Sequence, residues 1–335
     1  MSILGTKVKE HALIAHHADC IDGFTSAYIT EAMLYKKKPS IISTSLPMGY
    51  DEISIEILLS YLEGKLFSKL YVVDFSLDVE VLKKIHLKHP SLQVVIIDHH
   101  KTAFEKYLPE HKVNESSKGH VDLHGANIHL DITKSGAGMC WEYFNGPLSK
   151  EEVPALVKYI QDYDLWKFIY GDDTRYIHHY LCTQAKTMAN WSSIQKEMET
   201  TEGLTDMLYI GKKIKEQLDE EIKELALGAV GILILEEFKG LALPCKDKKL
   251  VSDLGHVLAV KSGTYGAVIT YCSDKEREVT INLRSNGDYD VSHIAKKFGG
   301  GGHKNAAGFI MNRKDYRAAL DKGDFMYGSD SEKEI

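Results

Sequence analysis

The stretch VVIIDHHKT, residues 94–102, decides the fold of the first half of the chain. Its four β-branched apolar residues are typical of a strand that is buried on both faces of a sheet. The run then ends in Asp98, His99 and His100, which are groups that need water, a proton or a metal ion. The stretch therefore predicts an interior strand with chemically active groups at its end.

Short apolar runs and amphipathic segments alternate around this stretch. The runs that predict strands are residues 11–17, 40–45, 69–75 and 92–98. The segments with helical spacing between them are residues 23–36, 51–63 and 77–89. This alternation is typical of βαβ units. We therefore expect an α/β fold whose N-terminal domain is a parallel sheet with helices on both faces.

Acids and imidazoles recur where three of the predicted strands end. In a parallel sheet these ends lie along one edge, and ligands bind in the crevice outside that edge. Carboxylates gathered in a crevice repel one another unless a cation compensates them, and mixed oxygen and nitrogen ligands suit Mn²⁺. The sequence thus predicts a metal site. Its candidate groups are His16, His17, Asp19, Asp22, Asp74, Asp98, His99 and His100.

The second half of the chain has a different pattern. Apolar residues at helical spacing predict one long helix over residues 203–227. Beyond it, strands are expected at 229–238, 265–272 and 278–285, with helices at 251–260 and 291–298, which describes a smaller mixed α+β domain. We expect a catalytic domain at 1–185, a helical connector at 186–228, a substrate-binding domain at 229–325 and a flexible tail at 326–335.

Composition narrows the class of protein. The 335 residues have a net charge of -7, so bulk electrostatics predicts no binding of long nucleic acid. The five cysteines form no CxxC motif, which favours a reducing compartment over a disulfide framework or a structural zinc site. No apolar run is long enough for a signal segment or a membrane span, and we expect a cytoplasmic protein that contacts no membrane.

Two motifs resemble those of a known family. DHH after an apolar strand, together with HHADCIDGFTSA at residues 16–27, resembles the DHH phosphoesterases. FGGGGHKNAAGF at residues 298–309 is similar to the glycine-rich signature of the DHHA1 domain. The resemblance covers nearly the whole chain, in the same order, with a long connector between the two motifs.

The resemblance implies a role for each candidate residue. Asp74 would bridge two Mn²⁺ ions, His100 would face the phosphate, and Asp98 would orient a histidine, as metal-bound imidazoles generally require. A further acid is expected from YIQDYDLWKF at 159–168, with Asp162 preferred to Asp164. The implied metal ligands are His17, Asp22, Asp74, His99 and Asp162.

The first metal position departs from the family pattern. Many members have H-x-x-x-D-x-D after the first strand, and counting from His16 places Cys20 where the first aspartate is expected. The position is then softer, weaker, or completed by Asp19 or a water. The same count leaves open whether His16 or His17 is the ligand.

The second domain is expected to bind the substrate. A run of glycines lets a phosphate approach backbone N–H groups closely, although such runs also mark ordinary loops. Arg284, at the end of a predicted strand, can bond a phosphate with two N–H groups. The candidates are Arg284, Gly300, Gly301, Gly302 and His303.

The resemblance implies a Mn²⁺-dependent phosphodiesterase, or 3′–5′ oligoribonuclease, that converts short oligoribonucleotides or linear dinucleotides such as pGpG or pApA to nucleoside monophosphates. Two alternatives stay open: a phosphomonoesterase acting on 3′-phosphoadenosine 5′-phosphate, and a non-catalytic nucleotide sensor. The expected partner is a short RNA or a dinucleotide. A homodimer remains an option for the chain itself.

Overall fold

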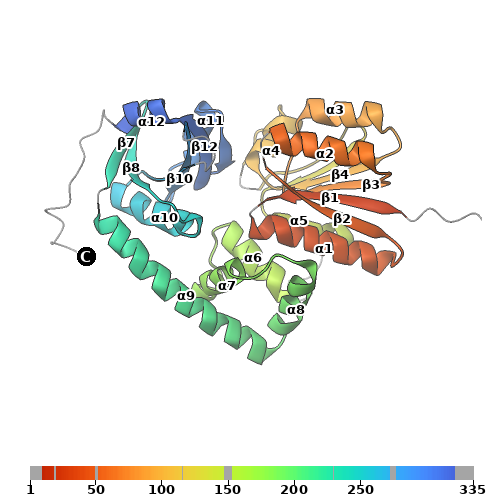
Figure 1. Cartoon of the computed structure of the whole chain (residues 1–335), viewed down its shortest axis with the longest axis horizontal. Coiled ribbons are helices and arrows are strands. Elements are labelled where there is room, and N and C mark those ends of the chain that lie inside the picture. Colours follow the sequence, from red (N-terminus) through yellow and green to blue (C-terminus); the bar gives the residue numbers. More distant parts are fainter. Residues whose placement is uncertain are drawn as a thin grey trace, which may run out of the picture. The chain divides into compact units, whose positions relative to one another are not determined.

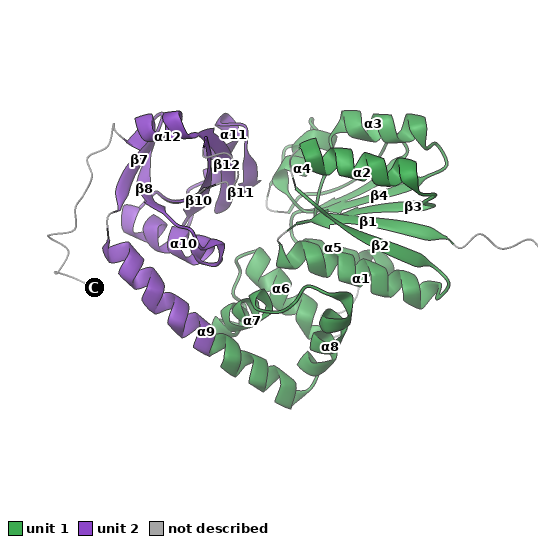
Figure 2. Cartoon of the chain, in the orientation of Figure 1, with its two compact units in different colours: residues 1–212 green, residues 213–335 purple. Residues whose placement is uncertain are grey.

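The computed structural model describes residues 10–18, 20–49, 52–114, 116–146, 153–228, 230–271 and 277–320. The chain divides into an N-terminal unit, residues 1–212, and a C-terminal unit, residues 213–335 (Figure 2). The division falls inside helix α9, Thr201–Leu227, which confirms the predicted long helix at 203–227. The predicted tail at 326–335 lies outside the described residues.

The N-terminal unit is built on a six-stranded sheet in the order β2-β1-β3-β4-β6-β5. Every neighbouring pair is parallel except β5 and β6, which form an antiparallel hairpin at one edge. The predicted parallel sheet is confirmed. The strands are β1 His11–His17, β2 Ile42–Met48, β3 Lys69–Val73, β4 Gln93–Asp98, β5 Lys118–Leu123 and β6 Ala126–Asp131.

Helices cover both faces of this sheet, as predicted (Figure 1). Strand β1 is apolar along its buried length because its side chains enter a core on each face of the sheet. Ala12 and Ile14 join the core beneath α1, α5, α6 and α8, whereas Leu13 and Ala15 join the core beneath α2, α3 and α4. The helices are α1 Ile21–Lys37, α2 Glu52–Gly64, α3 Val79–Lys88, α4 Lys101–Tyr107, α5 Gly136–Asn145, α6 Ala155–Asp164, α7 Asp172–Cys182 and α8 Met188–Met198.

The C-terminal unit has a second six-stranded sheet, in the order β11-β12-β10-β9-β8-β7. Its neighbours are antiparallel except β8 and β9, so the predicted mixed α+β domain is confirmed. The strands are β7 Gly231–Leu235, β8 Phe238–Pro244, β9 Tyr265–Tyr271, β10 Glu278–Ser285, β11 Gly301–His303 and β12 Ala306–Asn312. The helices are η1 Lys248–Leu250, α10 Val251–Ser262, α11 Val291–Lys297 and α12 Arg313–Leu320.

One predicted strand is wrong in its extent. The run at 229–238 is predicted as a single strand, but β7 ends at Leu235 and β8 begins at Phe238. Glu236 between them has φ 57°, a left-handed conformation that turns the chain. Across the described part of the chain, the structure contains no helix with the length and apolar character needed to span a membrane.

Candidate metal centre

The ends of three neighbouring strands form the candidate site. In the register of the sheet, His16 of β1 lies beside Val73 of β3, and Val73 lies beside Ile97 of β4. The next residues along the three strands are therefore side by side as well. These are His17, Asp74 and Asp98, residues from three separate segments of the sequence.

Asp74 lies at the middle of this edge. Its side chain is 1% exposed, and its backbone has φ 52°, a conformation that few residues other than glycine adopt readily. One carboxylate oxygen, Oδ1, lies 3.0 Å from Nε2 of His99, and the other, Oδ2, lies 3.7 Å from Nδ1 of His17. Burial raises the pKa of Asp74, but the histidines outweigh it and hold the pKa well below its usual range. Asp74 is thus an ionised carboxylate with imidazoles on two sides.

Asp22 reaches the same edge from the first turn of α1. Its carboxylate accepts hydrogen bonds from the backbone N–H groups of Gly136, at 2.6 Å, and Ala137, at 3.0 Å. These donors belong to the first turn of α5, where N–H groups have no partner within the helix. A Cβ on Gly136 would lie 2.6 Å from the Cβ of Asp74, so only glycine permits this approach. Asp22 therefore joins the two helices and also faces the site.

His99 lies among three carboxylates. Its Nε2 is 3.0 Å from Asp74, 3.5 Å from Asp164 and 3.8 Å from Asp22. Burial lowers the pKa of His99, but the surrounding acids, Asp164 foremost, outweigh it and raise the pKa to about 10. In the protein alone, a proton on His99 thus supplies the positive charge that the cluster requires.

Asp98 holds His100, and a carboxylate oxygen of Asp98 also lies within 4.8 Å of one of Asp74. Its Oδ1 lies 2.7 Å from Nδ1 of His100 and accepts the backbone N–H groups of His99 and His100. The hydroxyl of Ser76 donates to its Oδ2. Because Nδ1 of His100 is hydrogen-bonded to Asp98, the imidazole ring is held in one orientation. Its other nitrogen, Nε2, is directed away from Asp98. The orienting role of Asp98 stays a prediction, and its contact with Nδ1 of His100 is the observation that supports it.

The ligand atoms fit divalent metal ions. In the described part of the N-terminal unit, His17, Cys20 and Asp74 each offer one ligand atom, and these atoms lie within 4.8 Å of one another. Asp22, Asp74 and His99 form a second such group. Asp74 belongs to both groups, and each group combines donors that divalent transition metals accept. In a third group, Asp74, Asp98 and His100, the last two residues are hydrogen-bonded to each other, which leaves the first two groups as the candidate metal positions. The residues present therefore fit divalent ions, and Asp74 would contribute to both positions.

The structure separates His16 from His17. Successive residues of a strand point to opposite faces. His16 is 5% exposed and packs edge-on against Phe24, whereas His17 lies beside Asp74. The geometry therefore favours His17. Asp19, the alternative ligand from the same segment, lies outside the described residues.

Asp162 and Asp164 point in different directions. Two residues along a helix are separated by about 200° of rotation. The carboxylate of Asp162 accepts hydrogen bonds from the backbone of Ile169 and Tyr170 and from the hydroxyl of Thr174, so it organises the segment after α6. Asp164 instead lies beside His99. We therefore propose Asp164 in place of Asp162 as the ligand from this helix.

In the C-terminal unit, packing explains part of the glycine run. A Cβ on Gly300 would lie 2.1 Å from the carbonyl oxygen of Gly308, and Gly302 has φ 135°. Both glycines allow β11 to pair with β12, and His303 ends this short strand opposite Ala306. Gly301 lies between them in β11. These contacts give Gly300 and Gly302 a structural role whether or not they also approach a ligand.

Arg284 of β10 lies against α10. One guanidinium nitrogen donates to the hydroxyl of Ser252 at 3.0 Å, and the other to the carbonyl of Leu283 at 2.9 Å. Its aliphatic part covers Gly255, where an added Cβ would lie 2.7 Å from Cγ of Arg284. The guanidinium group of Arg284 is thus held in a defined position in the C-terminal unit.

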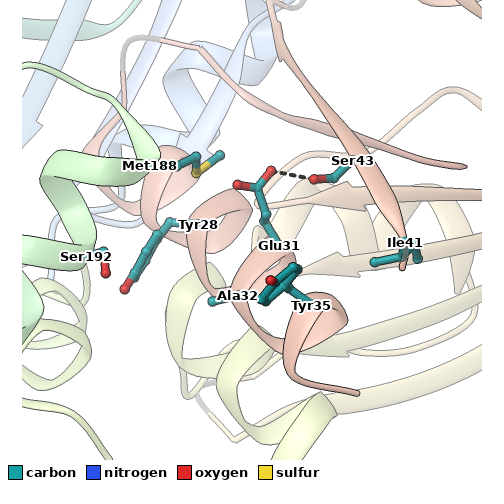
Figure 3. Close-up of a pocket in the computed structure, with 8 residues that line it drawn as sticks. All are labelled: Tyr28, Glu31, Ala32, Tyr35, Ile41, Ser43, Met188 and Ser192. Atoms are coloured by element: carbon teal, nitrogen blue, oxygen red, sulfur yellow. Dashed lines mark hydrogen bonds between the residues drawn. The ribbon is translucent and has the colours of Figure 1, made fainter. Parts of the chain in front are cut away.

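A separate cavity of about 240 Å³ lies along α1 and the start of α8 (Figure 3). Tyr28, Tyr35 and Met188 contribute to its lining. Its one acid, Glu31, accepts a hydrogen bond from the hydroxyl of Ser43 at 2.6 Å. The lining offers neither a histidine nor a second acid, so we place the chemistry at the strand ends instead.

Comparison with known proteins identifies the C-terminal unit. Residues 248–324 match the DHHA1 domain, so the predicted DHHA1 domain is confirmed. The uncharacterized protein R106 of Acanthamoeba polyphaga mimivirus is 27% identical over 309 residues, which cover 90% of this chain and 67% of that protein.

Solved structures with a similar arrangement include two of stated activity or ligand. RecJ in complex with Mn²⁺ from Thermus thermophilus is 12% identical with a TM-score of 0.49, over 94% of this chain and 51% of that chain. The pGpG-specific phosphodiesterase PggH from Vibrio cholerae is 10% identical with a TM-score of 0.44, over 93% and 97%. This chain thus spans about half the length of the RecJ chain.

Proposed function

We propose that this chain, whose residues 248–324 match the DHHA1 domain, is a phosphodiesterase of the DHH type that requires two divalent ions, preferably Mn²⁺, and releases nucleoside monophosphates from short oligoribonucleotides or linear dinucleotides. The observation that carries this proposal is the pair of ligand groups that share Asp74. Two metals held by one bridging carboxylate are a recurring arrangement in hydrolysis of phosphate esters.

The chemistry follows from what the side chains can do. When bound, a pair of divalent ions polarises a phosphoryl group and makes a water acidic enough to attack near neutral pH. Asp98 fixes the ring of His100 through Nδ1, which lets His100 donate a hydrogen bond to a charged phosphate oxygen. Because Asp74 and Asp22 are buried, solvent water does not compete for contacts with their carboxylates.

Charge supports a short substrate. The net charge of -7 gives no general attraction for a polyanion, and the Vibrio cholerae relative is named for its action on pGpG. We propose that the C-terminal unit binds part of the substrate through His303 and Arg284, since both can donate to phosphate and neither belongs to the unit that carries the ligand groups.

A longer single strand is the second candidate substrate. One cavity of the C-terminal unit, of about 590 Å³, is lined by four cations and an amide, namely Arg277, Asn312, Arg313, Lys314 and Arg317. A cationic groove of this kind suits a phosphate backbone. RecJ, one of the solved structures of similar arrangement, is described as an exonuclease.

Substrate length separates these candidates. We expect kcat/KM on a dinucleotide to exceed that on a strand of about twenty nucleotides by roughly tenfold or more, because a long strand needs a continuous basic track. The rates are compared with Mn²⁺ at one fixed ionic strength, and nucleoside monophosphates are quantified as the products. Addition of EDTA should abolish turnover, and restoring Mn²⁺ should recover it.

Equal kcat/KM on the two substrates would contradict the short-substrate proposal and favour an exonuclease. In that case the double variant Lys314→Ala/Arg317→Ala should slow hydrolysis of the long strand while leaving the dinucleotide reaction unchanged. Free phosphate from 3′-phosphoadenosine 5′-phosphate would instead identify a phosphomonoesterase. Binding of nucleotides without any turnover would identify a sensor.

Variants of the C-terminal unit test its part in binding. We expect His303→Ala and Arg284→Lys each to weaken dinucleotide binding by roughly tenfold, because a donor to phosphate or its two-pronged geometry is lost. The metal content should remain that of the wild type. Lys304→Ala is the matched control, since Lys304 follows His303 but forms an ion pair with Asp288 at 2.9 Å. Equal losses in the control, or loss of bound metal in either variant, would refute this assignment.

A further inference from the structure

One of the two ligand groups contains a sulfur atom. Cys20 immediately precedes α1, and its thiol lies with donor atoms of His17 and Asp74 in a group spanning at most 4.8 Å. Donors that share one ion are separated by no more than about twice a metal–ligand distance, which for sulfur is about 4.6 Å. The upper bound of 4.8 Å on the separations of these three donor atoms is near this limit.

The start of α1 is held close to His17 and Asp74. A Cβ on Gly23 would lie 2.5 Å from the carbonyl oxygen of His17 and 3.1 Å from Oδ2 of Asp74. Glycine is therefore required here, and the close packing that it permits fixes the position of Cys20 three residues earlier. Cys20 occupies the N-cap position, yet its side chain makes no capping hydrogen bond to the described residues of the helix.

The four described cysteines do not share one environment. Cys140 is completely buried in the apolar core, as a small hydrophobic residue would be. Cys20 is only partly buried and lies beside the donor atoms of His17 and Asp74. The environment of Cys140 is that of a cysteine that only fills space in the core. The environment of Cys20 is that of a cysteine that can bind a metal.

We propose that Cys20 is a metal ligand, so that the two metal positions differ in kind. The position formed by His17, Cys20 and Asp74 has nitrogen, sulfur and oxygen donors, whereas that formed by Asp22, Asp74 and His99 has oxygen and nitrogen alone. This inference rests on the metal centre of the proposed function. It assigns the first position a preference for Zn²⁺, Co²⁺ or Cd²⁺ over Mg²⁺, because thiolates bind soft and borderline ions and disfavour hard ones. On binding, the thiol releases its proton to solvent and the sulfur forms the bond to the ion.

Cobalt spectroscopy of the full chain tests this inference. Co²⁺ is titrated into the metal-free wild type and into Cys20→Ser, Cys20→Asp and Cys182→Ser. A thiolate ligand produces a sulfur-to-cobalt charge-transfer band in the near ultraviolet, whereas the weaker visible bands report bound cobalt with any ligands. Cys182→Ser is the matched control, because Cys182 belongs to the same unit and is also partly buried.

The wild type and Cys182→Ser should show the charge-transfer band. Cys20→Ser and Cys20→Asp should lose that band and keep visible bands from the second position. In competition, Cys20→Asp should shift the preference between Zn²⁺ and Mn²⁺ toward Mn²⁺ by roughly tenfold or more, since a hard oxygen replaces sulfur. Circular dichroism checks that each variant is folded, and Cys20→Asp gives a second reading if Cys20→Ser is not.

The outcomes are distinguishable. Visible bands without a charge-transfer band in the wild type would overturn the role of Cys20 and leave the metal centre of the proposed function intact. A charge-transfer band that persists in both Cys20 variants would do the same. Absence of every cobalt band in the folded wild type would overturn both the inference and the metal centre.

Discussion

Asp74→Asn should reduce kcat/KM by at least about 100-fold and remove bound metal, because Asp74 is common to both ligand groups. Asparagine preserves the shape of the side chain and tolerates the left-handed backbone found at this position, with φ 52°. Alanine at this position would add backbone strain to the loss of the ligand, so the two effects could not be separated. Turnover and metal content, measured by elemental analysis of the purified protein, check the expectation.

Asp122→Asn is a suitable control for Asp74→Asn. Asp122 is an acid of β5, whose strand carries none of the proposed ligands. Turnover within about twofold of wild type is expected, as for most surface substitutions. If Asp74→Asn retained metal and turnover near those of wild type, the assignment of the strand ends as a metal centre would have to be abandoned.

Asp164→Asn and Asp162→Asn should have opposite consequences. Asp164→Asn removes a carboxylate 3.5 Å from Nε2 of His99, so it should lower turnover by roughly 100-fold and weaken metal binding, with a smaller loss of stability than Asp162→Asn. Asp162→Asn weakens three hydrogen bonds to Ile169, Tyr170 and Thr174, so it should lower the free energy of unfolding by about 1–3 kcal/mol with metal affinity unchanged.

Urea unfolding and metal titration of the two variants separate these effects. Each variant is the control for the other, because the two positions lie on the same helix and carry the same side chain. The reverse result, with metal affinity lost in Asp162→Asn and stability lost in Asp164→Asn, would restore Asp162 as the ligand.

The sequence predicts the strand ends well because one physical rule governs them. Parallel strands end at one edge, so Asp74 and His99 could be brought together from their places after apolar runs. The same rule does not predict the hairpin of β5 and β6. Strand β5 has an alternating pattern of exposed and half-buried residues with no fully buried position, and such a strand has little apolar signal.

Sequence spacing does not determine the direction of single side chains. The adjacent histidines His16 and His17 differ only in which face of β1 they occupy, and Asp162 and Asp164 differ only in helical phase. A shift of one residue in the strand, or two in the helix, exchanges a buried structural role for a place at the site. Spacing alone cannot fix that phase, because it depends on how each element packs against its neighbours.

The hydrogen bonds between Asp22 of α1 and the first turn of α5 affect how mutations of Asp22 are interpreted. Its carboxylate accepts the N–H groups of Gly136 and Ala137, 114 and 115 residues further along the chain. We therefore expect substitutions of Asp22 to lower protein abundance and activity together, and substitutions of Asp164 to lower mainly activity. A genetic survey that scores only loss of growth would rank both positions alike, and pairing it with a measure of protein level would tell them apart.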